Sequence, residues 1–128
     1  MPATSFPEYA REIEDILHVL VASGEAMLLS IQVDQRSSLR GLIAGQVQLN
    51  DGSQLHIREF LDISLPEPRL AYSYHYHAGE GLIFRYDNAT HRPSLPRAEH
   101  KHTAAGVQVT SAPTLAEVIS EILSNPRR

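Results

Sequence analysis

Cysteine is absent from the 128 residues of this chain. Without it the chain can form no disulfide scaffold, zinc ribbon or thiol nucleophile, and its composition is compatible with a reducing cytosol. No apolar run approaches the length that crosses a membrane, and no secretory leader pattern stands at the beginning. We therefore expect a soluble, cytoplasmic protein with no membrane association.

Basic residues are also few. The chain has 11 Lys and Arg against 15 Asp and Glu, a formal net charge of −4. Nonspecific coating of nucleic acid draws on many Lys and Arg contacts to phosphate, so this composition argues against it. The basic residues are nevertheless unevenly spread, because Arg85, Arg92, Arg97 and Lys101 fall in one short stretch. This stretch predicts a local anion site on an acidic protein.

Two amphipathic helices are expected, one near each end of the chain. Ser5 and Glu8 have the spacing of a capping box, and apolar residues then recur at helical spacing over about 6–23. Thr114 begins the same capping pattern, which predicts a second helix over about 114–124.

Between these helices lie strand-like runs joined by short turns. The five runs are 26–33, 40–49, 54–63, 70–77 and 82–87. Short turns favour antiparallel hairpins, because parallel pairs need a dozen or more connecting residues. The sequence thus predicts a single α+β domain over residues 1–128, an antiparallel five-stranded meander with both helices packed on one face.

Turn residues also predict how the strands pair. A three-residue turn at 50–52 would place Val47 opposite Leu55. A three-residue turn at 78–80 would set up three further pairs: Tyr76 with Leu82, Tyr74 with Phe84, and Tyr72 with Tyr86. This aromatic face should lie under the helices, while the opposite face carries polar side chains that include His75, Arg85 and Asp87. Glu59 falls in phase with the apolar residues, so it lies at an edge, beside a bulge, or as a buried carboxylate with a partner.

Histidine is concentrated in the second half of the chain. Five of the seven histidines lie between His75 and His102. Imidazole gains or loses a proton near neutral pH, so the concentration indicates a functional site. Part of it falls in a stretch without periodicity, which we expect to be a histidine-rich basic loop over about 88–112. Unstructured connections of that length are uncommon unless they are functional or disordered.

Several short strings together resemble the TumE family of toxins from toxin–antitoxin modules. The strings are Arg58-Glu59-Phe60, Tyr72-Ser73-Tyr74-His75-Tyr76, Ile83-Phe84-Arg85-Tyr86-Asp87-Asn88-Ala89, His91 before a proline, and His100-Lys101-His102. The resemblance implies a single TumE-like toxin domain and a cognate TumA-like antitoxin with a helix-turn-helix domain. The chain departs from the family pattern at His91-Arg92, where paired histidines are common, and at Glu99, where another histidine often stands.

The main hypothesis for the chemistry is RNA cleavage without a metal or other cofactor. One histidine would remove the proton of a 2′-hydroxyl, a second would protonate the departing 5′-oxygen, and a cation would stabilise the phosphorane. The candidate catalytic residues are His75, Arg85, Asp87, His100, Lys101 and His102. The candidate substrate-binding residues are Arg58, Tyr74, Tyr76, Asn88, His91 and Arg92, with the two tyrosines available to stack on a base.

Two alternatives remain open at this point. Either His75 with His77, or His100 with His102, could supply two imidazole ligands to a metal, with Asp87 as an oxygen ligand. The chain could instead be a non-catalytic module whose surface binds the antitoxin or forms a homodimer. A nuclease would cut RNA in the presence of a chelator, a metal enzyme would lose that activity, and an interaction module would cut under neither condition.

Overall fold

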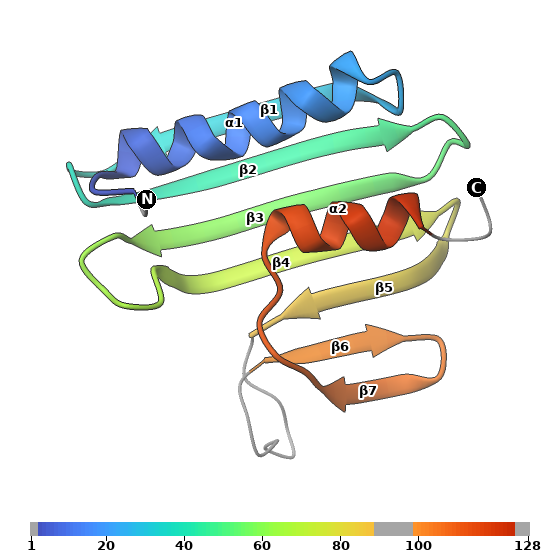
Figure 1. Ribbon diagram of the computed structural model, residues 1–128. Coiled ribbons are helices and arrows are strands. Elements are labelled where there is room, and N and C mark those ends of the chain that lie inside the picture. The colour runs from blue at the N-terminus through green and yellow to red at the C-terminus, as the bar shows by residue number, and fades with distance from the viewer. Residues whose placement is uncertain (1–2, 89–98, 125–128) are drawn as a thin grey trace.

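The computed structural model describes residues 3–88 and 99–124, and His91 and Arg92 therefore lie outside the described residues. Its elements are α1 (Phe6–Ala22), β1 (Ala26–Gln35), β2 (Arg40–Leu49), β3 (Gln54–Asp62), β4 (Arg69–Ala78), β5 (Gly81–Asp87), β6 (His100–Thr103), β7 (Gly106–Val109) and α2 (Leu115–Leu123). All strands join one antiparallel sheet in the order β1 to β7 (Figure 1). The fold is the predicted α+β meander, but with seven strands where five were predicted.

The two additional strands come from the stretch that was predicted to be a loop. His100–Thr103 and Gly106–Val109 form a hairpin, with Thr103 paired to Gly106, and β6 pairs with the last part of β5. Each strand has only four residues. Such short runs show too little alternation to be distinguished from a loop in the sequence, and it is pairing with β5 that makes them strands.

Both helices lie on one face of the sheet, as predicted. α1 runs along β1 and β2, and α2 lies over β3 and β4 (Figure 1). The capping side chains behave as the spacing indicated, since Ser5 Oγ accepts from the Glu8 amide and Thr114 forms a full capping box with Glu117. No helix of the described residues is long and apolar enough to cross a membrane.

The core fills the space between the helices and the sheet. Its largest fully buried side chains include Tyr74, Tyr76, Phe6 and Leu17. Gly41 permits the tightest contact, because a Cβ atom there would lie 2.3 Å from the Phe6 ring. A larger residue at this position would therefore push the start of α1 off the sheet.

The register of the hairpins was predicted in part. Val47 lies opposite Leu55, as expected. The second hairpin instead turns on two residues between Ala78 and Gly81, and a bulge follows between Tyr76 and His77. The bulge shifts the pairs, so Tyr76 lies opposite Phe84 and Tyr74 opposite Tyr86. One extra residue in one strand restores the alternation, so the aromatic side chains still face the helices.

Candidate active site on the open face of the sheet

The face of the sheet that the helices leave uncovered carries a row of reactive side chains. His56 of β3 is the cross-strand neighbour of His75 in β4, His75 is the neighbour of Arg85 in β5, and Arg85 is the neighbour of His102 in β6. We call these four residues the histidine row. Directly opposite residues in a sheet have Cβ atoms about 5 Å apart, so each member of the row is beside the next.

A second row runs parallel to the first, two residues along each strand. Arg58 lies opposite Ser73, Ser73 opposite Asp87, and Asp87 opposite His100. Side chains two residues apart on a strand share a face, so Asp87 lies beside Arg85 and close to both histidines of β6. The two rows together bring a carboxylate, a guanidinium and several imidazoles into one cluster.

Arg85 is the centre of this cluster. Its Nε atom lies 2.8 Å from Asp87 Oδ2, and one of its terminal amino groups lies 3.3 Å from His102 Nε2. A guanidinium is always protonated and can only donate, so His102 Nε2 is the acceptor in this contact. Asp87 Oδ2 also lies 3.5 Å from His102 Nε2. The Arg85 side chain is 40% exposed and that of His102 14% exposed, so both are accessible from the open face.

His100 has a different environment from His102. Its side chain is 1% exposed, and its Nε2 atom contacts Asp87 Oδ1. A side chain buried to this extent cannot touch a substrate. His100 therefore orients the Asp87 carboxylate, whose other oxygen binds Arg85.

His75 lies on the other side of Arg85, within a group of three histidines. The centroid of its ring is 5.3 Å from that of His77 and 6.1 Å from that of His56. Burial lowers the pKa of His75 below its ordinary value, and the charges of His77, Arg85 and His56 lower it further. His75 is therefore held neutral near pH 7, the form in which an imidazole accepts a proton.

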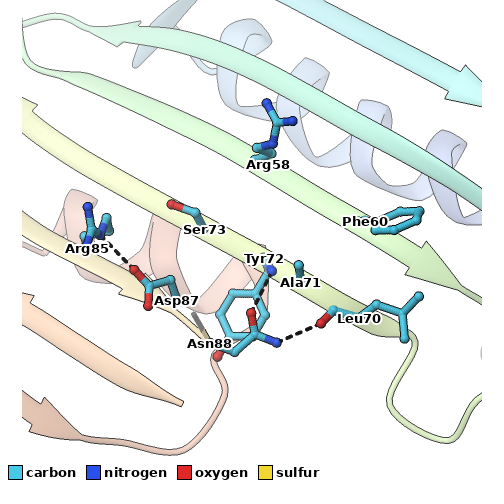
Figure 2. Close-up of a pocket in the computed structure, with 9 residues that line it drawn as sticks. All are labelled: Arg58, Phe60, Leu70, Ala71, Tyr72, Ser73, Arg85, Asp87 and Asn88. Atoms are coloured by element: carbon cyan, nitrogen blue, oxygen red, sulfur yellow. Dashed lines mark hydrogen bonds and ion pairs between the residues drawn. The ribbon is translucent and has the colours of Figure 1, made fainter. Parts of the chain in front are cut away.

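A groove follows these rows across the open face. One section has a volume of about 520 Å³ and is lined by residues that include Arg58, Phe60, Arg85 and Asp87 (Figure 2). A second section of about 350 Å³ is lined by residues that include His56 and His75. Arg58 and Ser73 line both sections, so the two sections adjoin.

Asn88 lies at the rim of the groove, where it holds the backbone together. Its side-chain oxygen accepts from the Tyr72 amide at 3.0 Å, and its amide group donates to the Leu70 carbonyl at 3.2 Å. Both contacts join the end of β5 to β4 (Figure 2). Asn88 was predicted to bind substrate, but its side-chain amide is thus already hydrogen-bonded to backbone groups.

Three other predicted site residues lie on the helix-covered face. Tyr74 and Tyr76 are 0% and 1% exposed, so neither ring can stack on a base as predicted. Lys101 points away from its neighbours His100 and His102, because adjacent residues of a strand face opposite sides. Its Nζ atom donates to Glu121 of α2 at 2.8 Å and lies over the rings of Phe84 and Tyr86. Lys101 therefore joins α2 to the sheet and is separated from the histidine row.

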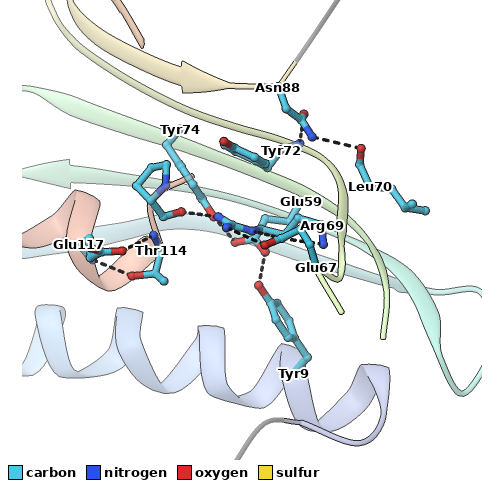
Figure 3. A network of polar contacts seen from close by, with 11 residues as sticks. Tyr9, Glu59, Glu67, Arg69, Leu70, Tyr72, Tyr74, Asn88, Thr114 and Glu117 are labelled. Atoms are coloured by element: carbon cyan, nitrogen blue, oxygen red, sulfur yellow. Dashed lines mark hydrogen bonds and ion pairs between the residues drawn. The ribbon is translucent and has the colours of Figure 1, made fainter. Parts of the chain in front are cut away.

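The helix-covered face holds a polar network, of which only Glu59 was predicted from the sequence. Glu59 is 0% exposed and accepts hydrogen bonds from Tyr9 at 2.5 Å and Tyr74 at 2.8 Å (Figure 3). Of the three placements expected for Glu59, the buried carboxylate with partners is confirmed. Arg69 extends the network, because it donates to Tyr74 and to the Pro113 carbonyl and pairs with Glu67. The roles of Tyr9 and Arg69 had no signal in the sequence, since both are common residue types at unremarkable spacing.

A metal site is the other chemical arrangement to consider on the open face. Asp87, His100 and His102 each offer one ligand atom, and these atoms lie within 4.8 Å of one another. Two imidazoles and a carboxylate suit ions such as Zn²⁺ or Fe²⁺. However, Arg85 already forms an ion pair with the Asp87 carboxylate and donates to His102 Nε2. The set fits a metal only if this guanidinium moves away, and in this arrangement Arg85 supplies the positive charge.

The fold and the site define a small α+β protein with a histidine-rich cluster on the open face of a meander sheet. The family model described as Toxin TumE matches residues 16–127, and the chain therefore belongs to the TumE toxin family. This confirms the resemblance seen in the sequence, and membership in a toxin family implies a cognate antitoxin. No curated protein and no solved structure matches the chain.

Proposed function

We propose that this toxin arrests growth by cutting RNA without a metal, and that His75 and His102 transfer the protons on either side of Arg85. The observation that carries the proposal is the cross-strand order His75, Arg85, His102. Two strand spacings of about 4.8 Å put the backbones of the two histidines about 10 Å apart, with the guanidinium between them. A phosphodiester bound to Arg85 would then have one imidazole on each side.

The two histidines take different roles in the proposed reaction. His75 is neutral near pH 7 and removes the proton of the 2′-hydroxyl. The 2′-oxygen bonds to phosphorus, and the bond from phosphorus to the 5′-oxygen breaks. His102 gives a proton to that departing oxygen after Arg85 has turned from His102 Nε2 to the phosphate, and the nearby Asp87 carboxylate stabilises the imidazolium that serves as the acid. The products are a 2′,3′-cyclic phosphate and a 5′-hydroxyl, so no water, metal or cofactor enters this step.

Arg85 stabilises the charge that builds on phosphorus in the transition state. The Asp87 carboxylate forms an ion pair with the Arg85 Nε atom at 2.8 Å, which holds the guanidinium in place before a substrate arrives. Donors that are already oriented stabilise a transition state without a further cost of reorganisation. His100 acts one step further away, because it holds the carboxylate that holds Arg85.

The proposed cellular role follows from the family. Growth arrest by the free toxin would be relieved by a TumA-like antitoxin with a helix-turn-helix domain, encoded beside it. We propose that the antitoxin covers the open face, because the groove and the histidine row lie on the side of the sheet that the helices leave uncovered.

The test compares the unaltered protein with variants in which one histidine is replaced. Inducing the toxin alone in bacteria should stop growth, and His75→Ala or His102→Ala should restore it. His18→Ala is the matched control, because His18 is an exposed histidine on α1. The purified protein should cut RNA in the presence of EDTA and leave 2′,3′-cyclic phosphate ends. Cutting that requires an added metal would favour the Asp87, His100 and His102 site, and no cutting under either condition would favour an interaction module.

A further inference from the structure

The groove has an apolar end beyond Arg58. Phe60, which is 38% exposed, and Leu70, which is 41% exposed, line the groove at this end. Phe60 lies on the same strand and the same face as Arg58 (Figure 2). Phe60 and Leu70 thus place exposed apolar surface in the same groove as Arg58 and Arg85.

Arg58 stands between this apolar end and the histidine row. Phe60, Arg58 and His56 follow one another at intervals of two residues along β3, so all three face the open side. Among residues 3–88 and 99–124, no ion pair involves Arg58. A cation next to an aromatic ring is the combination with which proteins bind single-stranded nucleic acid, since the cation contacts phosphate and the ring stacks on a base.

We propose that Arg58 and Phe60 form a subsite for a nucleotide near the one that is cut, and that the substrate is single-stranded RNA. Arg58 contacts a backbone phosphate, and Phe60 stacks on the base. The subsite rests on the proposed RNA cleavage for its purpose, but binding and cutting are separate measurements. The four residue steps from His56 to Phe60 span about 13 Å along the strand, so the stacked base belongs to a nucleotide beyond the two that flank the cut.

Stacking on Phe60 favours an unpaired strand, and the rigid rim of the groove favours tight binding. Bases inside a duplex already stack on one another, so their faces are not available to an aromatic side chain. The groove is also preformed, because the Asn88 side chain fixes the backbone of Tyr72 and Leu70 at its rim. A binding site that is rigid before the ligand arrives loses less conformational entropy on binding.

The binding experiment uses His102→Ala protein, which leaves the RNA uncut, and a fluorescent single-stranded octaribonucleotide. Adding Phe60→Ala should weaken binding about 5- to 150-fold, the range observed when one base–aromatic stack is lost. Phe60→Trp should keep or strengthen binding, which excludes loss of folding as the cause. Val19→Ala is the control, because Val19 is 69% exposed on α1, on the other side of the sheet. A duplex of the same sequence should bind more weakly and should not respond to Phe60→Ala.

A cleavage experiment separates the subsite from the chemistry. In otherwise unaltered protein, Phe60→Ala should raise KM for the octaribonucleotide and leave kcat/KM for a dinucleotide unchanged, because a dinucleotide is too short to reach Phe60. If the octamer binds through Phe60 but is never cut, the subsite stands and the proposed cleavage fails. If both substrates are cut and Phe60→Ala changes neither, or weakens both equally, the subsite is wrong and the cleavage stands.

Discussion

The two faces of the sheet each hold a buried carboxylate close to an arginine, and they use it in different ways. Glu59 lies under the helices, and its neighbour Arg69 has a side chain that is only 7% exposed. Asp87 lies on the open face, and its partner Arg85 has a side chain that is 40% exposed and lines the groove. The enclosed network joins α1, the sheet and the start of α2, whereas the open one presents a cation to the solvent. Removing a residue from the first should lower stability, and from the second should lower activity.

Glu59→Ala should have the largest effect on stability. It leaves the hydroxyls of Tyr9 and Tyr74 without their acceptor in a buried place, and it opens a cavity. The expected cost is about 3 to 5 kcal/mol in the free energy of unfolding, measured by denaturant titration. Glu12→Ala, an exposed carboxylate on α1, should change it by less than about 0.5 kcal/mol. Equal effects of the two substitutions would show that the enclosed network is not structural.

The same carboxylate should make stability depend on pH. Burial raises the pKa of Glu59 above its ordinary value of 4.5, so the folded state disfavours the charged form. Its contribution to stability is complete below pH 4.5 and is lost as the pH rises through the raised value. The stability of the wild type relative to Glu59→Gln should therefore fall as the pH rises above 4.5. A difference that grows with pH would contradict this account of the network.

Lys101→Ala tests which face of the sheet Lys101 serves. Its contact with Glu121 is partly exposed, and it lies over two aromatic rings, so we expect a loss of about 1 kcal/mol in stability. RNA cleavage should change by less than about threefold, because the proposed catalytic groups His75, Arg85 and His102 lie on the opposite face. Arg36→Ala, which removes a more exposed ion pair with Asp34, should cost less than Lys101→Ala. A large loss of activity with unchanged stability would show that Lys101 acts in the active site.

His77→Gln should have the smallest effect, seen only in the pH profile. The charge of His77 helps to lower the pKa of His75 below 6.5, after burial. If His75 is the base, the acid limb of kcat/KM has its midpoint below pH 6.5, and this midpoint moves upward in the variant. His18→Gln should leave the midpoint in place. A midpoint that moves downward would mean that the ionisation of a group other than His75 determines the acid limb of the pH profile.

Much of the fold could be predicted because it depends on local patterns. Capping residues mark both helices, and the alternation of β2 to β5 identifies the face under the helices. The register of β4 against β5 could not be predicted, because the alternation of the sequence shows no sign of the bulge between Tyr76 and His77. β6 and β7 were missed because four residues carry too little periodicity.

The site could be predicted only where alternation decides which face a side chain takes. His75, Arg85 and Asp87 were assigned to the open face because their strands were recognised. Lys101 was grouped with its histidine neighbours because β6 was not recognised as a strand, and this places alternate residues on opposite sides. Tyr74 and Tyr76 were assigned to the buried face and also to base stacking, two expectations that are incompatible for side chains with no exposed surface.

The assignment of His102 as the acid can be tested with two RNA substrates in EDTA. One is a dinucleotide whose leaving group is an ordinary ribose 5′-oxygen, and the other carries a p-nitrophenolate leaving group that needs no proton. The account predicts that His102→Ala lowers kcat about 10²- to 10⁴-fold on the first substrate and less than about tenfold on the second. Equal losses on both substrates, or loss of wild-type cleavage in EDTA, would contradict metal-free proton transfer by the histidine row.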